Sequence, residues 1–128
     1  MKGTIAFDFD GVISTYEGFK GVDVFGEPIP ETITAMQKLS SLGYNIIIFT
    51  TRIDTPALRA WLKKYQVPYN DINRNSSFNP PQTSNKPVWQ AYVGDRTVRF
   101  DVRNHRLSRD DLVSLIESTV AEGMRDAK

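Results

Sequence analysis

The sequence contains no cysteine, a single histidine and no long apolar run. The absence of cysteine excludes disulfide bonds, thiolate metal sites and cysteine nucleophiles, although it does not fix the redox compartment. No apolar segment approaches the length of a membrane span, and no signal-peptide pattern precedes the first apolar run. We therefore expect a cytoplasmic protein that does not bind membranes.

An excess of either charge is also missing. The 128 residues include 16 basic and 15 acidic side chains, which gives a formal net charge of +1. This balance does not favour a nucleic-acid coat protein. A hydrophobic content of 40% and the absence of repeats or linkers are ordinary for a globular protein with one core. We expect a single domain over residues 1–128.

Strand-like and helix-like segments alternate along the chain. Short consecutive apolar runs predict strands at residues 3–9, 44–50, 67–72 and 88–93. Apolar residues at helical spacing, behind capping residues, predict helices at residues 31–42, 56–65 and 108–120. This alternation is typical of an α/β fold, here a three-layer, Rossmann-like parallel sheet with helices on both faces.

Two carboxylates, Asp8 and Asp10, end the first apolar run, and Gly11 follows them. Side chains two positions apart on a strand share a face, so both acids should enter one site beyond the strand's carboxyl end. Two close anions need a cation or a shared proton. A plain turn is an alternative. A helix–loop–helix calcium site is excluded, because Ile13 and Phe19 stand where it needs glycine and glutamate.

Asp8-Phe9-Asp10-Gly11-Val12 after a strand resembles the opening motif of the haloacid dehalogenase (HAD) superfamily of aspartate-nucleophile phosphohydrolases. Three later places are similar to that family in the same order. They are Phe49-Thr50-Thr51-Arg52 at a strand end, Lys86, and Tyr92-Val93-Gly94-Asp95-Arg96. Residues 8–30 look like the small members that lack a cap domain, because only a loop fits between Asp10 and the next helix.

The resemblance implies a Mg²⁺-dependent phosphatase acting on a small phosphometabolite or nucleotide through an aspartyl-phosphate. Asp8 would be the nucleophile, and Asp10 would donate and then accept a proton. Thr50, through its hydroxyl and backbone N–H, and Lys86 would stabilise the phosphoryl group. Mg²⁺ would bind Asp8, the Asp10 carbonyl and Asp95. The residues expected to contact substrate are Gly11, Thr51, Arg52 and Arg96.

One position departs from the family pattern. Gly94 stands where relatives often have a second acid, which leaves open whether Asp95 or Asp101 completes the metal site. This departure gives some weight to a non-catalytic binding domain. The arginine-rich segment 96–109 is either a solvated basic face or a surface for a polyanion, so a phosphatase for nucleic-acid termini is a further alternative.

Residues 13–30 form an irregular stretch with more apolar and aromatic side chains than a solvated loop needs. We expect this segment to fold over the site entrance or to form a homo-oligomer contact. The alternative is that it packs against the helices of its own domain.

Overall fold

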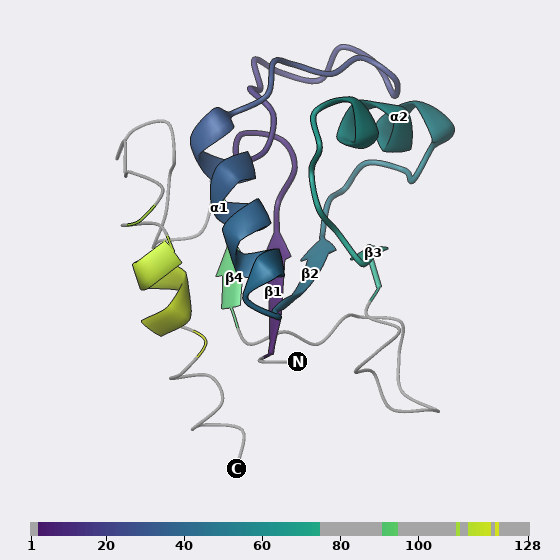
Figure 1. Ribbon diagram of the computed structural model, residues 1–128. Helices are drawn as coiled ribbons and strands as arrows, with labels where there is room; N and C mark the ends of the chain where they lie inside the picture. The colour runs from purple at the N-terminus through teal and green to yellow at the C-terminus, as the bar shows by residue number, and fades with distance from the viewer. Residues whose placement is uncertain (1–2, 75–90, 95–109, 111–112, 119, 121–128) are drawn as a thin grey trace.

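The computed structural model describes residues 3–74, 91–94, 110, 113–118 and 120 (Figure 1). In this part of the chain, parallel strands form a four-stranded sheet in the order β3-β2-β1-β4. The strands are β1 (Thr4–Phe7), β2 (Asn45–Ile48), β3 (Asp71–Ile72) and β4 (Ala91–Val93). Helices flank the sheet, among them α1 (Pro30–Ser41) and α2 (Pro56–Lys64). The predicted α/β fold with a parallel sheet is confirmed.

β1 lies inside the sheet, with β2 on one side and β4 on the other. Every residue of β1 and of β2 is buried. Burial on both faces explains why these strands read as consecutive apolar runs instead of alternating ones. The predicted strand at 3–9 was too long, because regular strand structure ends at Phe7 and the chain turns at Phe9. Both acids therefore lie beyond the strand.

The two helices begin and end at residues that suit helix termini. Pro30 and Pro56 occupy the first turns, where a missing N–H costs nothing. The Thr55 side chain caps α2 by accepting a hydrogen bond from the Leu58 N–H at 3.2 Å. Gly43 follows the end of α1 with φ +98°, a conformation that glycine adopts without strain. The predicted limits of both helices lie within one residue of the observed ones.

Residues 113–118 are helical, and Figure 1 shows this segment near α1. Val113, Ile116 and Val120 are buried in the hydrophobic core. The Tyr44 hydroxyl donates a hydrogen bond to the Glu117 carboxylate at 3.1 Å, which links this segment to the start of β2. Burial, followed by the hydrogen bond and the charge of Glu117, raises the pKa of Tyr44. No helix in the described ranges is long and apolar enough to cross a membrane.

The β1–α1 loop, residues 8–29, has a paired stem. The Thr15 N–H donates to the Glu27 carbonyl at 2.8 Å, and the Ile29 N–H donates to the Ile13 carbonyl at 2.8 Å. Gly26 lies in one arm of this stem, close to Thr15 in the other arm. A Cβ at position 26 would lie 2.1 Å from the Thr15 carbonyl oxygen. The stem thus requires glycine at position 26 for close backbone approach.

Residues 16–25 form the tip of this loop. Phe25 packs edge-on against the fully buried Phe9, with ring centroids 5.9 Å apart, and lies 6.4 Å from the Trp61 ring on α2. Phe19, in contrast, is 66% exposed, and Val22 and Val24 are also exposed. The loop therefore packs in part against its own domain, which is the alternative given in the sequence analysis. Other apolar side chains at its tip face outward.

Replacing Gly26 with alanine should destabilise the fold by about 2–4 kcal/mol, because the new methyl group overlaps the Thr15 backbone. Urea unfolding measures the loss. Gly18→Ala is the comparison, since a Cβ at Gly18 meets nothing within 4 Å and only its φ of +104° is strained. That variant should lose about 1 kcal/mol. Equal losses would contradict the proposed overlap.

Candidate active site

Polar side chains gather where the parallel strands end. Asp8 directly follows β1, Thr50 comes soon after β2, Asn73 directly follows β3, and Gly94 directly follows β4. The Asp8 N–H donates to the Val93 carbonyl at 2.8 Å, so the ends of β1 and β4 stay paired beyond the last strand residue. Because the carboxyl ends of parallel strands share one edge of a sheet, these residues border a common site.

A tight turn, and not an extended strand, positions the two acids. The Phe9 carbonyl accepts N–H groups from the residues that follow, including Ser14 at 3.0 Å. Gly11 has φ +84°, and its N–H donates to the Ser14 carbonyl at 2.7 Å. Phe9 is fully buried, while Asp8 and Asp10 on either side of it are half-buried. The Asp8 carboxylate accepts the Phe9 N–H at 2.8 Å. Both acids thus reach the edge of the sheet while Phe9 enters the core.

Arg52 forms an ion pair with Asp10. Its Nε lies 3.0 Å and 2.9 Å from the two carboxylate oxygens. Its Nη1 donates to the Val22 carbonyl at 3.1 Å and to the Gly21 carbonyl at 3.4 Å, and its Nη2 donates to the Val24 carbonyl at 3.0 Å. That Arg52 contacts substrate stays a prediction. In this structure the guanidinium is directed at Asp10 and at the backbone of the loop tip.

The Arg52 side chain is also enclosed by aromatic rings. Its Cζ lies 5.0 Å from the Phe25 ring centroid and 5.6 Å from that of Phe9. Only 8% of Arg52 is exposed. A buried guanidinium needs hydrogen-bond acceptors and an opposite charge, and the Asp10 carboxylate with the loop carbonyls supplies both.

Asn73 links the end of β3 to the end of β2. Its Oδ1 accepts the Thr50 N–H at 2.8 Å, and its Nδ2 donates to the Arg52 carbonyl at 3.3 Å. Its own N–H donates to the Ile48 carbonyl at 2.8 Å, and its φ is +59°. The Thr50 N–H, expected to face a phosphoryl group, is therefore bonded to Asn73 here. The Thr50 hydroxyl accepts the Arg52 N–H at 3.1 Å, and its own proton has no acceptor among the described residues.

Asn73 is a residue that the sequence analysis missed. Its signal was an asparagine directly after a predicted strand, since asparagine tolerates the left-handed conformation better than most residues. Its partners lie 21 and 23 positions away in the chain, so no local pattern could name them.

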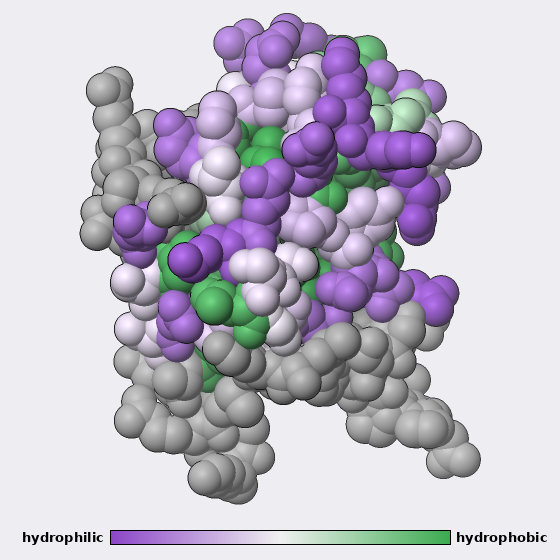
Figure 2. Space-filling model, viewed as in Figure 1, coloured by the Kyte–Doolittle hydropathy of each residue, from purple (hydrophilic) through white to green (hydrophobic). Residues whose placement is uncertain are grey.

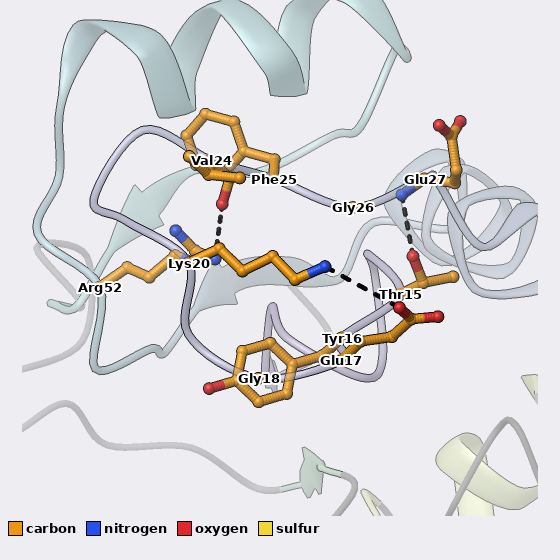
Figure 3. A pocket seen from close by; sticks show the side chains of 10 residues that line it. All are labelled: Thr15, Tyr16, Glu17, Gly18, Lys20, Val24, Phe25, Gly26, Glu27 and Arg52. Atoms are coloured by element: carbon orange, nitrogen blue, oxygen red, sulfur yellow. Dashed lines mark hydrogen bonds and ion pairs between the residues drawn. The ribbon is translucent and has the colours of Figure 1, made fainter.

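A pocket of about 260 Å³ lies inside the loop tip and ends at Arg52 (Figure 3). Figure 3 shows the rings of Tyr16 and Phe25 on opposite sides of it, with Lys20 between them. The Lys20 ammonium lies 3.9 Å from the Glu17 carboxylate. Side chains of both charges therefore line this pocket. Arg52 connects it to Asp10, because Arg52 lines the pocket and also forms the ion pair with that acid.

Three predicted site residues, Lys86, Asp95 and Arg96, lie outside the described residues. Within the described ranges, no group of three or more metal-ligating side chains occurs. The chain nevertheless leaves β4 beside Asp8, because Val93 pairs with Phe7 in register. Oxygen donors from Asp8, from the Asp10 carbonyl and from an acid shortly after β4 are the type that Mg²⁺ prefers, so the residue set fits that ion.

Figure 2 shows hydrophilic residues over much of the upper part of the molecule, in the region where Figure 1 places the β1–α1 loop. Another ion pair lies near the start of α2, where Arg59 Nη2 is 2.7 Å from the Asp54 carboxylate. The hydrogen bond from Arg59 lowers the pKa of Asp54. Unlike the Arg52–Asp10 pair, this one is largely exposed, with half of the Arg59 side chain accessible.

Comparisons with known proteins support the fold. No protein-family model and no curated protein sequence matches the chain. A conserved protein from Bacteroides thetaiotaomicron is similar in structure, with a TM-score of 0.61 and 20% identity over 86% of this chain and 96% of that one. A crystallised target from Vibrio cholerae gives a TM-score of 0.53 and 22% identity over 98% of both chains.

A chain of a Pnkp1/Rnl/Hen1 complex is also similar, with a TM-score of 0.54 and 16% identity. The match covers 82% of this chain and 43% of that one. At such identities the likeness shows the α/β fold and nothing further.

Asn73→Ala should destabilise the protein by about 2–3 kcal/mol, because it removes two hydrogen bonds and places at φ +59° a residue that adopts this conformation less readily than asparagine. Asn73→Gly removes the same hydrogen bonds without the backbone strain, so its loss should be about 1–2 kcal/mol. Urea unfolding of both variants separates the two contributions. A glycine variant as weak as the alanine variant would show that strain has no part in the effect.

Proposed function

We propose that the chain is a Mg²⁺-dependent phosphatase that hydrolyses a phosphate monoester through an aspartyl-phosphate intermediate. The observation that supports this most directly is the pair of half-buried acids, Asp8 and Asp10, in a glycine turn at the end of an inner parallel strand. The resemblance of their motif to that of the HAD phosphohydrolases supports the same reaction. The proposed substrate is a small phosphometabolite or a nucleotide.

The reaction takes two displacements at phosphorus. In the first, a carboxylate oxygen of Asp8 bonds to phosphorus, the bond from phosphorus to the leaving oxygen breaks, and Asp10 gives that oxygen a proton. In the second, a water oxygen bonds to phosphorus and gives its proton to Asp10. The bond from phosphorus to Asp8 then breaks, which releases inorganic phosphate and restores the carboxylate.

Other polar groups at the same edge would balance the charge of the phosphoryl group. The Thr50 hydroxyl can donate a hydrogen bond to a phosphoryl oxygen, and Lys86 is proposed to add a positive charge. Bound Mg²⁺ supplies charge neutralisation for Asp8 and the phosphate. Asp8, the Asp10 carbonyl and Asp95 are the residues proposed to hold it.

The loop pocket, about 260 Å³ in volume, is lined by neither Asp8 nor Asp10, so it does not define the size of the leaving group. A phosphatase for nucleic-acid termini is the second candidate, and the likeness to a chain of a Pnkp1/Rnl/Hen1 complex is the observation that favours testing it. A panel of phosphorylated metabolites, nucleotides and 5′- or 3′-phosphorylated oligonucleotides separates the two candidates.

Asp8→Asn should lower steady-state hydrolysis of p-nitrophenyl phosphate by at least ~10³-fold, because the amide keeps the shape and removes the attacking charge. Release of p-nitrophenol measures the rate. Glu31→Gln is the matched control, since Glu31 is an exposed acid in the first turn of α1. An Asp8→Asn variant that keeps more than a tenth of the activity would exclude the nucleophile role.

EDTA should abolish the hydrolysis, and added Mg²⁺ should restore it. Ca²⁺ should restore little, because its larger and looser coordination misplaces the nucleophile relative to the phosphate. Asp95→Ala should raise the Mg²⁺ concentration needed for half-maximal activity. If Asp101→Ala does so instead, Asp101 supplies the third ligand, and activity that survives EDTA would contradict metal dependence altogether.

A further inference from the structure

The guanidinium of Arg52 makes all its described hydrogen bonds to the protein itself. Nε contacts both oxygens of Asp10, and the two Nη atoms donate to carbonyls of the loop tip. Arg52 is 8% exposed, and its Nε, Nη1 and Nη2 atoms each donate to at least one of these partners. The contacts therefore assign Arg52 to Asp10 and to the loop.

The ion pair does not occupy every acceptor position of the Asp10 carboxylate. A single N–H group is shared between its two oxygens, at 3.0 Å and 2.9 Å. Each oxygen of a carboxylate has further lone-pair positions that this one donor does not occupy. The pair thus fixes the orientation of the carboxylate without closing it to a leaving oxygen or a water.

The same side chain also holds the loop tip. Gly21, Val22 and Val24 each accept a hydrogen bond from it through a backbone carbonyl. Val22 and Val24 are exposed, so apolar burial contributes little at these positions. Phe25 and the hydrogen bond from the Thr55 hydroxyl to Asp23, at 3.0 Å, also bind the tip to the domain.

We propose that Arg52 is a positioning residue that holds the Asp10 carboxylate and the loop tip as one unit, so that Asp10 is placed for proton transfer while the loop is closed. The catalytic part of this inference rests on the proposed phosphatase function. Proton transfer requires the carboxyl group within hydrogen-bond reach of the leaving oxygen, and small displacements weaken it.

The first test compares two substrates with Arg52→Met. An alkyl phosphate such as glycerol phosphate has a poor leaving group and depends on the proton from Asp10, whereas p-nitrophenyl phosphate depends on it much less. We expect kcat to fall by at least ~10²-fold with glycerol phosphate and by less than ~10-fold with p-nitrophenyl phosphate, with KM nearly unchanged for both.

Two further variants sharpen this test. Arg59→Met removes another arginine that is paired with an aspartate and should leave both rates unchanged, because Arg59 pairs with Asp54. Arg52→Lys keeps the positive charge but lacks the planar guanidinium, so it should recover part of the kcat lost with glycerol phosphate. The same variant shows whether the fold tolerates a substitution at position 52. A rise in KM for both substrates would assign Arg52 to substrate binding. An equal loss of kcat with glycerol phosphate and with p-nitrophenyl phosphate would show that Arg52 only supports the fold. Either result overturns the proposal.

The second test does not depend on activity. Trypsin cleaves after lysine, and Lys20 in the loop tip has a side chain that is 63% exposed. Mass spectrometry can follow the first cut at the Lys20–Gly21 bond in the folded protein. Both Arg52→Met and Asp10→Asn should speed this cut at least ~10-fold, as expected when a local opening is favoured, and Arg59→Met should not.

The two tests fail in different ways. A wild-type protein without phosphatase turnover would overturn the proposed function and, with it, the catalytic part of this inference. Unchanged protection of Lys20 in both Arg52→Met and Asp10→Asn would overturn the link between loop and acid, whatever the activity is.

Discussion

The contact on which the candidate site depends is the ion pair between Arg52 and Asp10. Burying a guanidinium and a carboxylate costs several kcal/mol per ion, and attraction alone repays that only when hydrogen bonds complete the arrangement. Here the loop carbonyls and the rings of Phe9 and Phe25 complete it. Since the partners come from the ends of β1 and β2 and from the loop between β1 and α1, these three parts of the chain depend on each other.

The strand order of the parallel sheet brings the partners of this ion pair close together. β1 lies between β2 and β4, so the residues that follow these strands emerge side by side at one edge. β3 joins the same edge through Asn73, which bonds to the backbone of Thr50 and Arg52. Each strand end therefore contributes either a polar side chain to the site or a hydrogen bond that holds one in place. A displacement of the backbone at one strand end would therefore also displace the residues at the other strand ends.

Local patterns were sufficient for the elements. Proline, threonine and glycine at the helix termini placed α1 and α2 within one residue, because capping is a short-range effect. Strand limits were less accurate, since apolar runs continue past the last regular strand residue, as Phe49 does after β2. The predicted strand at 3–9 included Asp8, whereas both acids follow β1, and the glycine turn and not strand alternation positions them.

The partners of the site residues could not be predicted, because they are set by contacts far apart in sequence. The sequence analysis named Arg52 as a substrate contact, which stays a prediction, and named no partner for it within the protein. Its carboxylate partner lies 42 positions away and its carbonyl partners 28 to 31. Every residue has a backbone carbonyl, so the sequence does not indicate which carbonyl groups accept hydrogen bonds from Arg52. What the sequence does indicate is an arginine next to a strand-terminal threonine, and only the folded loop shows which way its side chain turns.

The outer residues of the loop tip are held by polar contacts and not by apolar burial, and this bears on how the tip can move. Phe19 is 66% exposed and Val24 is 47% exposed, so opening the tip would give up little apolar contact there. It would, however, take Arg52 away from its carbonyl partners and leave a buried charge incompletely bonded. The carboxylate of Asp10 is the other partner of that charge, so the position of the acid and the closure of the loop are set by one set of hydrogen bonds.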